Sequence, residues 1–220
     1  MKIIARIHNA YDEKFGVPRQ SGLAEEVISV IVFEPEYRVD EALRGIEDFS
    51  HLWLIWAFDR AERETWSPTV RPPRLGGNKR VGVFATRSPF RPNAVGLSCV
   101  RLIAKEKTRE GTVLKVAGAD LMNGTPVYDI KPYLPYADCI PDATGGFTDQ
   151  TEKRSVTVRI VPEAAEKLTA EEQCMLTDVL KEDPRPAYQD DPDRVYTFGF
   201  AGKQIRFRVQ GSLLTVEEIL

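Results

Sequence analysis

Residues 51–58 have the sequence HLWLIWAF, and this stretch does most to decide the fold. Apolar side chains occupy both sets of alternating positions, so neither face of a strand formed here is suited to water. A run of this kind is typical of a central strand that is covered on both sides. We therefore expect a sheet built around residues 51–58, with Trp53 and Trp56 in the core.

Short strand-like segments lie on both sides of this run. They are rich in Val, Ile, Phe and Trp and are separated by Gly, Pro and Asn. Residues 39–46 fit a single short amphipathic helix between two of them. This spacing favours a closed or sandwiched sheet, and nothing in it resembles a doubly wound nucleotide fold. The expected strands are residues 3–8, 27–33, 51–58, 81–86, 95–103, 112–119 and 127–130.

The sequence changes character after residue 147. Thr169 and Glu172 make a capping-box pair, which predicts the start of a helix that ends before Pro184. Strand-like segments are expected at residues 155–161, 194–200, 204–209 and 213–217. We therefore expect a mainly β protein, with an N-terminal domain of residues 1–148 and a small α+β C-terminal domain of residues 149–220.

The composition of the 220-residue chain is that of a soluble globular protein. It is 42% hydrophobic and 29% charged, with a net charge of −3. No apolar run approaches the roughly 18 residues that a membrane helix needs. The N-terminal residues MKIIARIHNA also lack a signal-peptide cleavage site. We therefore expect neither secretion nor insertion into a membrane.

Cysteine and histidine usage limits the chemistry that the chain can carry. Cys99, Cys139 and Cys174 are far apart and show no CxxC spacing. This favours a reducing compartment, the cytoplasm, and argues against disulfides or a zinc site. His8 and His51 are the only histidines, so a His-rich metal centre and a Ser-His-Asp triad are poorly supplied. We expect no metal ion.

A basic stretch lies inside this acidic chain, because no acidic residue occurs between Ser67 and Arg101. A local basic cluster is typical of a site for an anionic partner such as nucleic acid. The alternative is a solvated surface balanced by neighbouring carboxylates. The seven basic residues are Arg71, Arg74, Lys79, Arg80, Arg87, Arg91 and Arg101.

Two rigid loops carry most of these basic side chains. Prolines, glycines and an asparagine make residues 72–78 an exposed turn, and two prolines fix the backbone of residues 86–93. Arginine presents a planar fork to carboxylate or phosphate and a flat face to a base. We interpret both segments as binding loops, with well-formed turns and solvated arginines as the alternative.

Two further loops are candidates for the same site. Residues 14–20 follow the first strand and again place an arginine, Arg19, next to a proline. Asn123-Gly124 is a strong turn signal. A turn that exposes backbone donors and acceptors can hydrogen-bond the edge of a purine, although such a turn is usually just a hairpin.

These segments together resemble the TsaA-like (TrmO) family of tRNA methyltransferases. The agreement covers roughly residues 3–148, and residues 183–188 (DPRPAY) also resemble the second domain of the bacterial members. The matching segments are KFGVPRQSGL (14–23), FSHLWLIWAF (49–58), RPPRLGGNKRVGVFATRSPFRPNAVGLS (71–98) and NGTPVYDIKPYLPYAD (123–138), with PDA (141–143) close behind.

The resemblance implies a fold, a reaction and a partner. The family has a single-sheet β-barrel, and it dimerises. It uses S-adenosylmethionine to methylate N6 of threonylcarbamoyladenosine at tRNA position 37, beside the anticodon. We therefore expect S-adenosylmethionine as the cofactor, the anticodon stem-loop of tRNA as the partner, and a homodimer.

The resemblance also implies a cofactor site made from separate segments. This chain has Asn123 where many members have aspartate, and Asp59 where they have histidine. Asn123 can still bond a ribose or base edge, whereas ionised Asp59 cannot donate a hydrogen bond. Ala94 replaces a proline and relaxes the loop. The expected cofactor-binding residues are Pro18, Arg19, Gln20, Asp59, Arg60, Arg87, Leu97, Asn123, Gly124, Thr125 and Pro126.

Basic side chains are expected to bind the tRNA. The threonyl carboxylate of the modified base needs a counter-charge, and Arg91 or Arg87 is the hypothesis, because both lie on the rigid TRSPFRP loop. The others are suited to phosphate groups of the anticodon stem-loop. The expected tRNA contacts are Arg71, Arg74, Lys79, Arg80, Arg91 and Arg185.

The acceptor nitrogen is a poor nucleophile while it keeps its proton, so a base would help. Asp129 and Tyr128 are the candidates, and a plain ion pair of Asp129 with Lys131 is the more frequent alternative. Two other functions stay open at this point. One is a methyltransferase acting on another RNA base or a small molecule, and the other is a non-enzymatic RNA-binding β-barrel.

Overall fold

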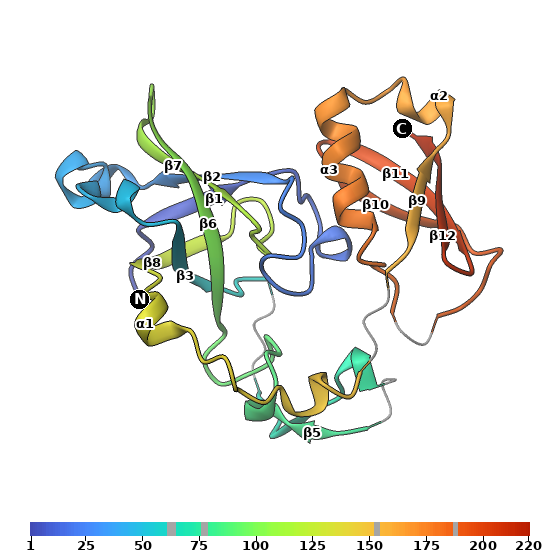
Figure 1. The fold of residues 1–220 in the computed structure, drawn as a ribbon, viewed down its shortest axis with the longest axis horizontal. Coiled ribbons are helices and arrows are strands. Elements are labelled where there is room, and N and C mark those ends of the chain that lie inside the picture. The colour runs from blue at the N-terminus through green and yellow to red at the C-terminus, as the bar shows by residue number, and fades with distance from the viewer. Residues whose placement is uncertain (61–64, 76–78, 152–154, 187–188) are drawn as a thin grey trace.

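A computed structural model describes residues 1–60, 65–75, 79–151, 155–186 and 189–220. Strands dominate it, and they form two separate sheets and one short ribbon. Figure 1 shows the two sheets side by side, with the ribbon below them. The expected mainly β fold is confirmed.

The first sheet closes on itself as a barrel, because its first strand pairs with its last. The order around the barrel is β1-β2-β7-β6-β3-β8, and every neighbouring pair is antiparallel. The strands are β1 (Ala5–His8), β2 (Ile28–Phe33), β3 (His51–Ala57), β6 (Val95–Thr108), β7 (Gly111–Ala117) and β8 (Pro126–Pro132). β6 and β8 are longer than the sequence predicts.

Strand β3 lies between β6 and β8, as its apolar sequence predicts. Leu52, Leu54 and Trp56 point into the barrel and are buried. The opposite face is only half-buried, and there the Trp53 indole donates a 3.0 Å hydrogen bond to Asp138. The expectation that both tryptophans are core residues is therefore wrong for Trp53, because only one face of a barrel strand points inward.

Two other predictions fail locally. Residues 39–46 form no α-helix but two 3-10 turns, Asp40–Leu43 (η3) and Ile46–Asp48 (η4), because Gly45 between them has a left-handed φ of 80°. Residues 81–86 are not one strand. Only Val81–Gly82 (β5) pairs, with Thr69–Val70 (β4), and Val83–Ala85 (η6) is a 3-10 turn.

The second sheet has the order β10-β11-β12-β9, with β9 parallel to β12. Its strands are β9 (Thr157–Ile160), β10 (Tyr196–Phe200), β11 (Lys203–Gln210) and β12 (Leu213–Ile219). Helices α2 (Pro162–Ala165) and α3 (Ala170–Leu180) accompany it. The predicted capping box is confirmed, since Thr169 and Glu172 bond each other's backbone N–H groups. Strand residues outnumber helical ones in this α+β part.

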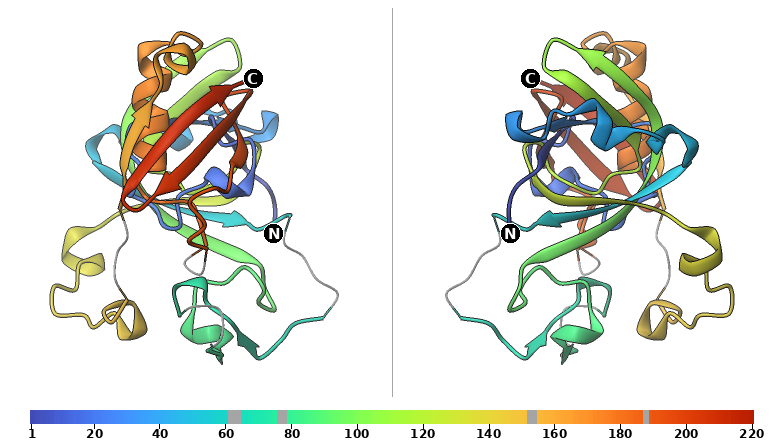
Figure 2. Two further views of the ribbon diagram at one scale, coloured as in Figure 1. Left: turned by 90° about the vertical axis from the view of Figure 1, so that its right-hand side faces the viewer. Right: turned by 90° about the vertical axis from the view of Figure 1, so that its left-hand side faces the viewer.

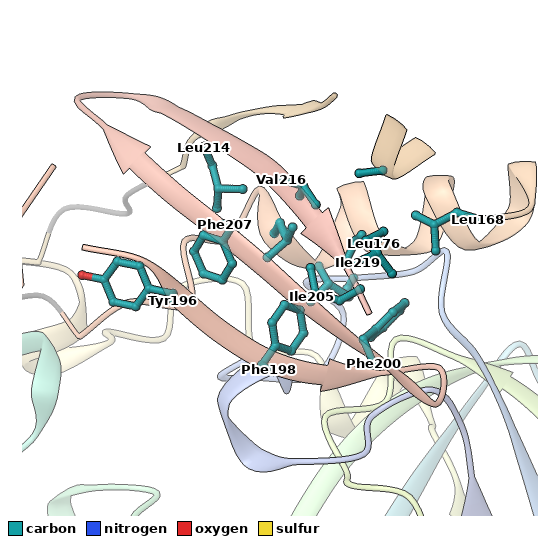
Figure 3. Close-up of a cluster of buried hydrophobic side chains, with 14 of the residues drawn as sticks. Leu168, Leu176, Tyr196, Phe198, Phe200, Ile205, Phe207, Leu214, Val216 and Ile219 are labelled. Atoms are coloured by element: carbon teal, nitrogen blue, oxygen red, sulfur yellow. The ribbon is translucent and has the colours of Figure 1, made fainter. Parts of the chain in front are cut away.

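The core of the second sheet includes side chains from the first loop of the barrel. Figure 3 shows the aromatic centre of this core, where Phe198, Phe200 and Phe207 lie together. Tyr11 and Val27 are buried in the same core, although both belong to the segment between β1 and β2. The second core is therefore built from both ends of the chain.

The remaining elements are short. No helix among the described residues is long and apolar enough to cross a membrane. Within the same residues, no three His, Cys, Asp or Glu side chains are grouped as metal ligands would be. The short elements are η1 (Lys14–Gly16), η2 (Pro35–Tyr37), η5 (Pro73–Leu75), α1 (Pro135–Asp138) and η7 (Gly146–Thr148).

Candidate functional site

Antiparallel pairing brings three loops to one end of the barrel. The last residues of β1, β3 and β7 lie beside the first residues of β2, β6 and β8, as the partners Ala57 and Val95 illustrate. The connections at this end are residues 9–27, 58–94 and 118–125. They contain all the expected cofactor residues except Leu97 and Pro126, each of which lies near the start of the next strand.

A side-chain hydrogen bond joins the first two loops. Arg87 Nη1 donates to Gln20 Oε1 at 2.5 Å, so two expected cofactor residues 67 positions apart lie in contact. Pro18, in the first of these loops, is buried, whereas Arg87 is exposed. The contact leaves the Arg87 guanidinium at the surface of the three loops, which together are called the loop cluster below.

Arg19 connects the same loop to the C-terminal part of the chain. Its Nη2 donates to the backbone carbonyl of Arg185 at 2.5 Å and lies 3.4 Å from that of Asp183. Both carbonyls belong to the DPRPAY segment. Arg19 therefore holds the first loop of the barrel against the turn that follows α3.

The Asn123-Gly124 turn closes the third loop. Gly124 has a left-handed φ of 83°. The N–H of Asn123 donates to the carbonyl of Tyr11, and that of Gly124 donates to Ile7. These two backbone donors are therefore already engaged within the protein, and the role of the turn in binding the cofactor stays a prediction. The side-chain oxygen of Asn123 also accepts the N–H of Asn9, at 3.3 Å.

Asp120 belongs to the third of these loops and is not among the site residues expected from the sequence. Ser98 Oγ donates to its carboxylate, and Trp56 Nε1 donates to Ser98 Oγ at 2.9 Å. Burial raises the pKa of Asp120, while the Ser98 hydrogen bond, nearby backbone N–H groups and the charge of Arg87 act in the opposite direction. One sequence signal was present, since this carboxylate directly follows a buried strand and precedes the Asn-Gly turn by three residues.

The two catalytic candidates lie on strand β8. Asp129 Oδ2 is 2.9 Å from Lys131 Nζ, and its Oδ1 accepts the N–H of Ile130 at 2.9 Å. The carboxylate thus forms the ion pair that was the alternative interpretation. Tyr128 is half-buried at a bulge in the pairing of β3 with β8. Their catalytic role stays a prediction.

The expected tRNA contacts divide into exposed and engaged side chains. Arg71, Lys79 and Arg80 are exposed on or beside the β4–β5 ribbon, and Arg80 donates to Thr69 Oγ1 at 2.8 Å. Figure 2 shows this ribbon projecting from the body of the molecule. The side chain of Arg74 is outside the described part of the structure. Arg91 is half-buried, because its Nη1 donates to the carbonyl of Thr86 at 2.9 Å.

Arg185 is not available to a phosphate group in this structure. Only 5% of the residue is exposed, and its Nε and Nη2 donate to the Asp183 carboxylate at 2.8 and 2.9 Å. The expectation that Arg185 contacts tRNA is therefore corrected, since its guanidinium is buried and forms an ion pair with two hydrogen bonds.

Three further expected cofactor residues are exposed. Asp59 and Arg60 lie in the turn after β3, and Leu97 is 55% exposed on β6.

Comparison with known protein families matches both parts of the chain. The model of the tRNA-methyltransferase O N-terminal domain matches residues 6–139. The model of the TrmO C-terminal domain matches residues 153–220. The chain belongs to the TrmO family.

Individual relatives and solved structures match between 78% and 99% of the chain. A protein of Escherichia coli K12 named tRNA (adenine(37)-N6)-methyltransferase is 40% identical over 214 residues, which are 94% of this chain and 91% of that protein. A protein of the same name from Eikenella corrodens is 42% identical over 78% of this chain and 97% of its own length. The crystal structure of TrmO from Pseudomonas aeruginosa superposes with a TM-score of 0.80 at 30% identity, covering 99% of this chain and 97% of that one.

The Asn123 departure from the TrmO pattern has a local explanation. The side-chain oxygen at this position accepts a backbone N–H, and the amide of asparagine and the carboxylate of aspartate both offer that oxygen. The substitution therefore preserves the turn. It also adds an amide donor and removes a negative charge from the loop cluster.

Proposed function

We propose that this protein uses S-adenosylmethionine to methylate N6 of threonylcarbamoyladenosine at position 37 of tRNA. The observation that carries the proposal is the contact of Gln20 with Arg87 at the barrel end where the Asn123-Gly124 turn also lies. It supports a single site assembled from three loops, and relatives of the same family carry the name tRNA (adenine(37)-N6)-methyltransferase.

The loop cluster has the chemical groups that the cofactor needs. When bound, S-adenosylmethionine supplies an activated methyl group on a cationic sulfur. Arg87 is an exposed cation suited to the methionyl carboxylate, and Leu97 is an exposed apolar side chain suited to the adenine ring. Apart from its two chain neighbours, no atom of the described residues lies within 4 Å of where a Cβ on Gly124 would be, so a ligand can approach this backbone closely. Asn123 has an amide donor for a ribose or base edge.

Asp120 is suited to position the loops rather than to bind phosphate or tRNA. It accepts the Ser98 hydroxyl, and the Ser21 backbone N–H and the Arg87 charge both favour its ionised form. These interactions connect Ser98, on strand β6, with the loop that carries Gln20. Tyr128 and Asp129 remain the proposed groups for removing the N6 proton, with a free Asp129 requiring that its ion pair with Lys131 opens.

Arg87 and Arg91 are the proposed counter-charges for the threonyl carboxylate. With Arg87 assigned to the methionyl carboxylate of the cofactor, Arg91 is left for the threonyl carboxylate, and its Nη1 is already bonded to carbonyl groups of its own loop. Arg71, Lys79 and Arg80 are proposed to contact phosphates of the anticodon stem-loop. No carboxylate lies in their sequence neighbourhood to neutralise them.

We further propose a cytoplasmic homodimer with the expected domains, residues 1–148 and 149–220. The exposed apolar side chain of Ile103 on the outer surface of β6 supports an interface between copies there. Sedimentation of the purified protein at several concentrations tests the dimer.

A methylation assay tests the reaction. The purified protein is incubated with methyl-labelled S-adenosylmethionine and either threonylcarbamoylated tRNA or the same tRNA with unmodified A37. We expect one labelled methyl group on N6 of the modified nucleoside after digestion, and none on plain A37. Label on another base or a small molecule would instead favour a methyltransferase that acts on that substrate. Binding of tRNA without any binding of S-adenosylmethionine would favour a non-enzymatic RNA-binding barrel.

A further inference from the structure

Two aromatic rings lie together in water beside the basic loops. Trp66 is 52% exposed and Phe84 is 71% exposed. Their ring centroids are 6.1 Å apart, with 31° between the ring planes. Of the aromatic ring pairs in the described residues, this is the one in which both rings are exposed.

The local backbone holds Phe84 outward. Its neighbour Val83 is almost fully buried and donates its N–H to the carbonyl of Pro68 at 2.9 Å. Val83 also starts the 3-10 turn η6, whose last hydrogen bond runs from Thr86 N–H to the Val83 carbonyl at 3.1 Å. Burial of Val83 therefore fixes the turn and leaves Phe84 facing solvent.

Arg91 supports the exposed ring from one side. Its guanidinium carbon lies 5.9 Å from the centroid of Phe84, within the range of a cation–π contact. The same guanidinium is anchored to the carbonyl oxygens of Thr86 and Ser88. Phe84 is thus held in position before any ligand binds, although its exposure gives up the free energy that burial would provide.

The charged residues around the two rings indicate which kind of ligand the rings bind. The acid-free stretch from Ser67 to Arg101 contains Phe84, directly follows Trp66, and carries the exposed cations Arg71, Lys79 and Arg80. Exposed aromatic faces combined with cations are the features by which proteins hold unpaired nucleotides, because every base has a π face and every nucleotide a phosphate.

We propose that Trp66 and Phe84 form a stacking platform for an unpaired base of the anticodon loop, next to the adenosine that is methylated. The proposal rests on the proposed function, since it places this base beside the cofactor loops. Phe84 precedes Arg87 by three residues, so it lies within about 11 Å of it along the chain. One base stacked on Phe84 and a neighbouring base at the loop cluster are therefore compatible.

The test compares Phe84→Leu with Tyr136→Leu. Leucine keeps an apolar side chain but removes the ring, and Tyr136 is a matched control because it is an exposed aromatic residue on helix α1. The Kd for a threonylcarbamoylated anticodon stem-loop is measured by fluorescence anisotropy at several salt concentrations. We expect Phe84→Leu to weaken binding roughly 10-fold, as loss of one stacked base does. Tyr136→Leu should bind like the wild type.

The salt dependence separates stacking from charge. Phe84→Leu should leave the slope of log K against log salt unchanged, whereas Lys79→Ala should reduce it by about 0.7–0.9. A Kd for Phe84→Leu within two-fold of the wild type would overturn the platform, as would a change in its salt slope. A switch from dimer to monomer in sedimentation would also overturn it and would assign the rings to an interface between copies.

Two measurements on the same samples distinguish failure of the stacking platform from failure of the proposed function. Phe84→Leu should bind S-adenosylmethionine with the wild-type Kd in calorimetry. If the wild type methylates the stem-loop while Phe84→Leu matches it in Kd, only the platform fails. If the wild type neither binds nor methylates the stem-loop, the proposed function fails and the platform with it.

Discussion

Arg87 and Gln20 are 67 residues apart in the chain, and the guanidinium of one donates a 2.5 Å hydrogen bond to the side-chain oxygen of the other. This bond joins the loop before β6 to the loop after β1 at the surface of the barrel end. The positive charge of Arg87 also acts on the half-buried carboxylate of Asp120 and favours its ionised form. The ligand chemistry of the protein is expected to depend on this contact.

Replacing Arg87 should weaken cofactor binding. We expect Arg87→Ala to raise the Kd for S-adenosylmethionine by roughly 10-fold or more, because a hydrogen bond to a charged group contributes about 1.5–3 kcal/mol. Arg44→Ala is the control, since Arg44 is an exposed arginine in the connection between β2 and β3, at the other end of the barrel. Calorimetric titration measures both, and equal Kd values for the two variants would remove Arg87 from the site.

Replacing Asp120 should separate stability from activity. Asp120→Asn keeps the oxygen that accepts the Ser98 hydroxyl but removes a charge that burial disfavours. We expect the melting temperature at pH 7 to rise by roughly 2–4 °C. Methylation should slow, because the loop around Gln20 loses a charged anchor. Wild-type kcat and KM in the variant would leave Asp120 with a structural role only.

The pH dependence of stability follows from the direction of the same shift. The pKa of Asp120 is higher in the folded protein than in the unfolded chain, so the folded protein holds the proton over a pH window that begins near 3.9. Raising the pH through this window releases the proton and lowers the free energy of unfolding. We expect the advantage of Asp120→Asn over the wild type to grow from pH 4 to pH 7 in urea melts. An advantage that shrinks over this range would contradict the assignment.

Gly16 connects the first loop to the second core. A Cβ at this position would lie 2.4 Å from Cε2 of Phe198, so the ring would have to move. We expect Gly16→Ala to lower the free energy of unfolding by about 1–3 kcal/mol. Gly82→Ala is the matched control, because its Cβ position has no atom of the described part of the chain within 4 Å, chain neighbours apart, and its φ is −58°. Denaturant unfolding compares the two, and equal losses would argue against the packing explanation.

Arg185 and Lys79 should behave in opposite ways. Arg185→Ala leaves Asp183 buried without its partner, so we expect a loss of about 3–5 kcal/mol in stability. Lys79→Ala should leave the melting temperature unchanged and weaken binding to all tRNAs equally. Thermal melts and filter binding measure the two effects. A stable Arg185→Ala protein with a reduced salt slope would restore the tRNA contact expected from the sequence.

The sequence predicts the strands better than the loops. Alternating or continuous apolar residues locate β1, β2, β3 and β7, because the apolar pattern of a strand can be recognised from a few consecutive residues. Residues 39–46 have the apolar spacing of a helix, yet Gly45 adopts a left-handed conformation that interrupts it. The family resemblance assigns the separate cofactor segments to one site, but no local pattern predicts which side chains contact each other there.

Asp120, Arg91 and Arg185 illustrate that limit. Each is a charged residue whose role depends on partners chosen by the tertiary fold. Arg185 is buried and donates two hydrogen bonds to Asp183, whose φ is positive at 45°, and a sequence pattern reveals neither feature. Arg91 bonds its own loop and supports Phe84, so its charge is engaged before any substrate arrives.

The core shared between the two sheets has a consequence for how the molecule comes apart. Tyr11 and Val27 are buried among the aromatic residues of the C-terminal sheet, and the loop between them carries Pro18, Arg19 and Gln20. Melting of that sheet would expose these anchors and release the loop from both sides. The barrel and the sheet are therefore expected to unfold in one cooperative transition.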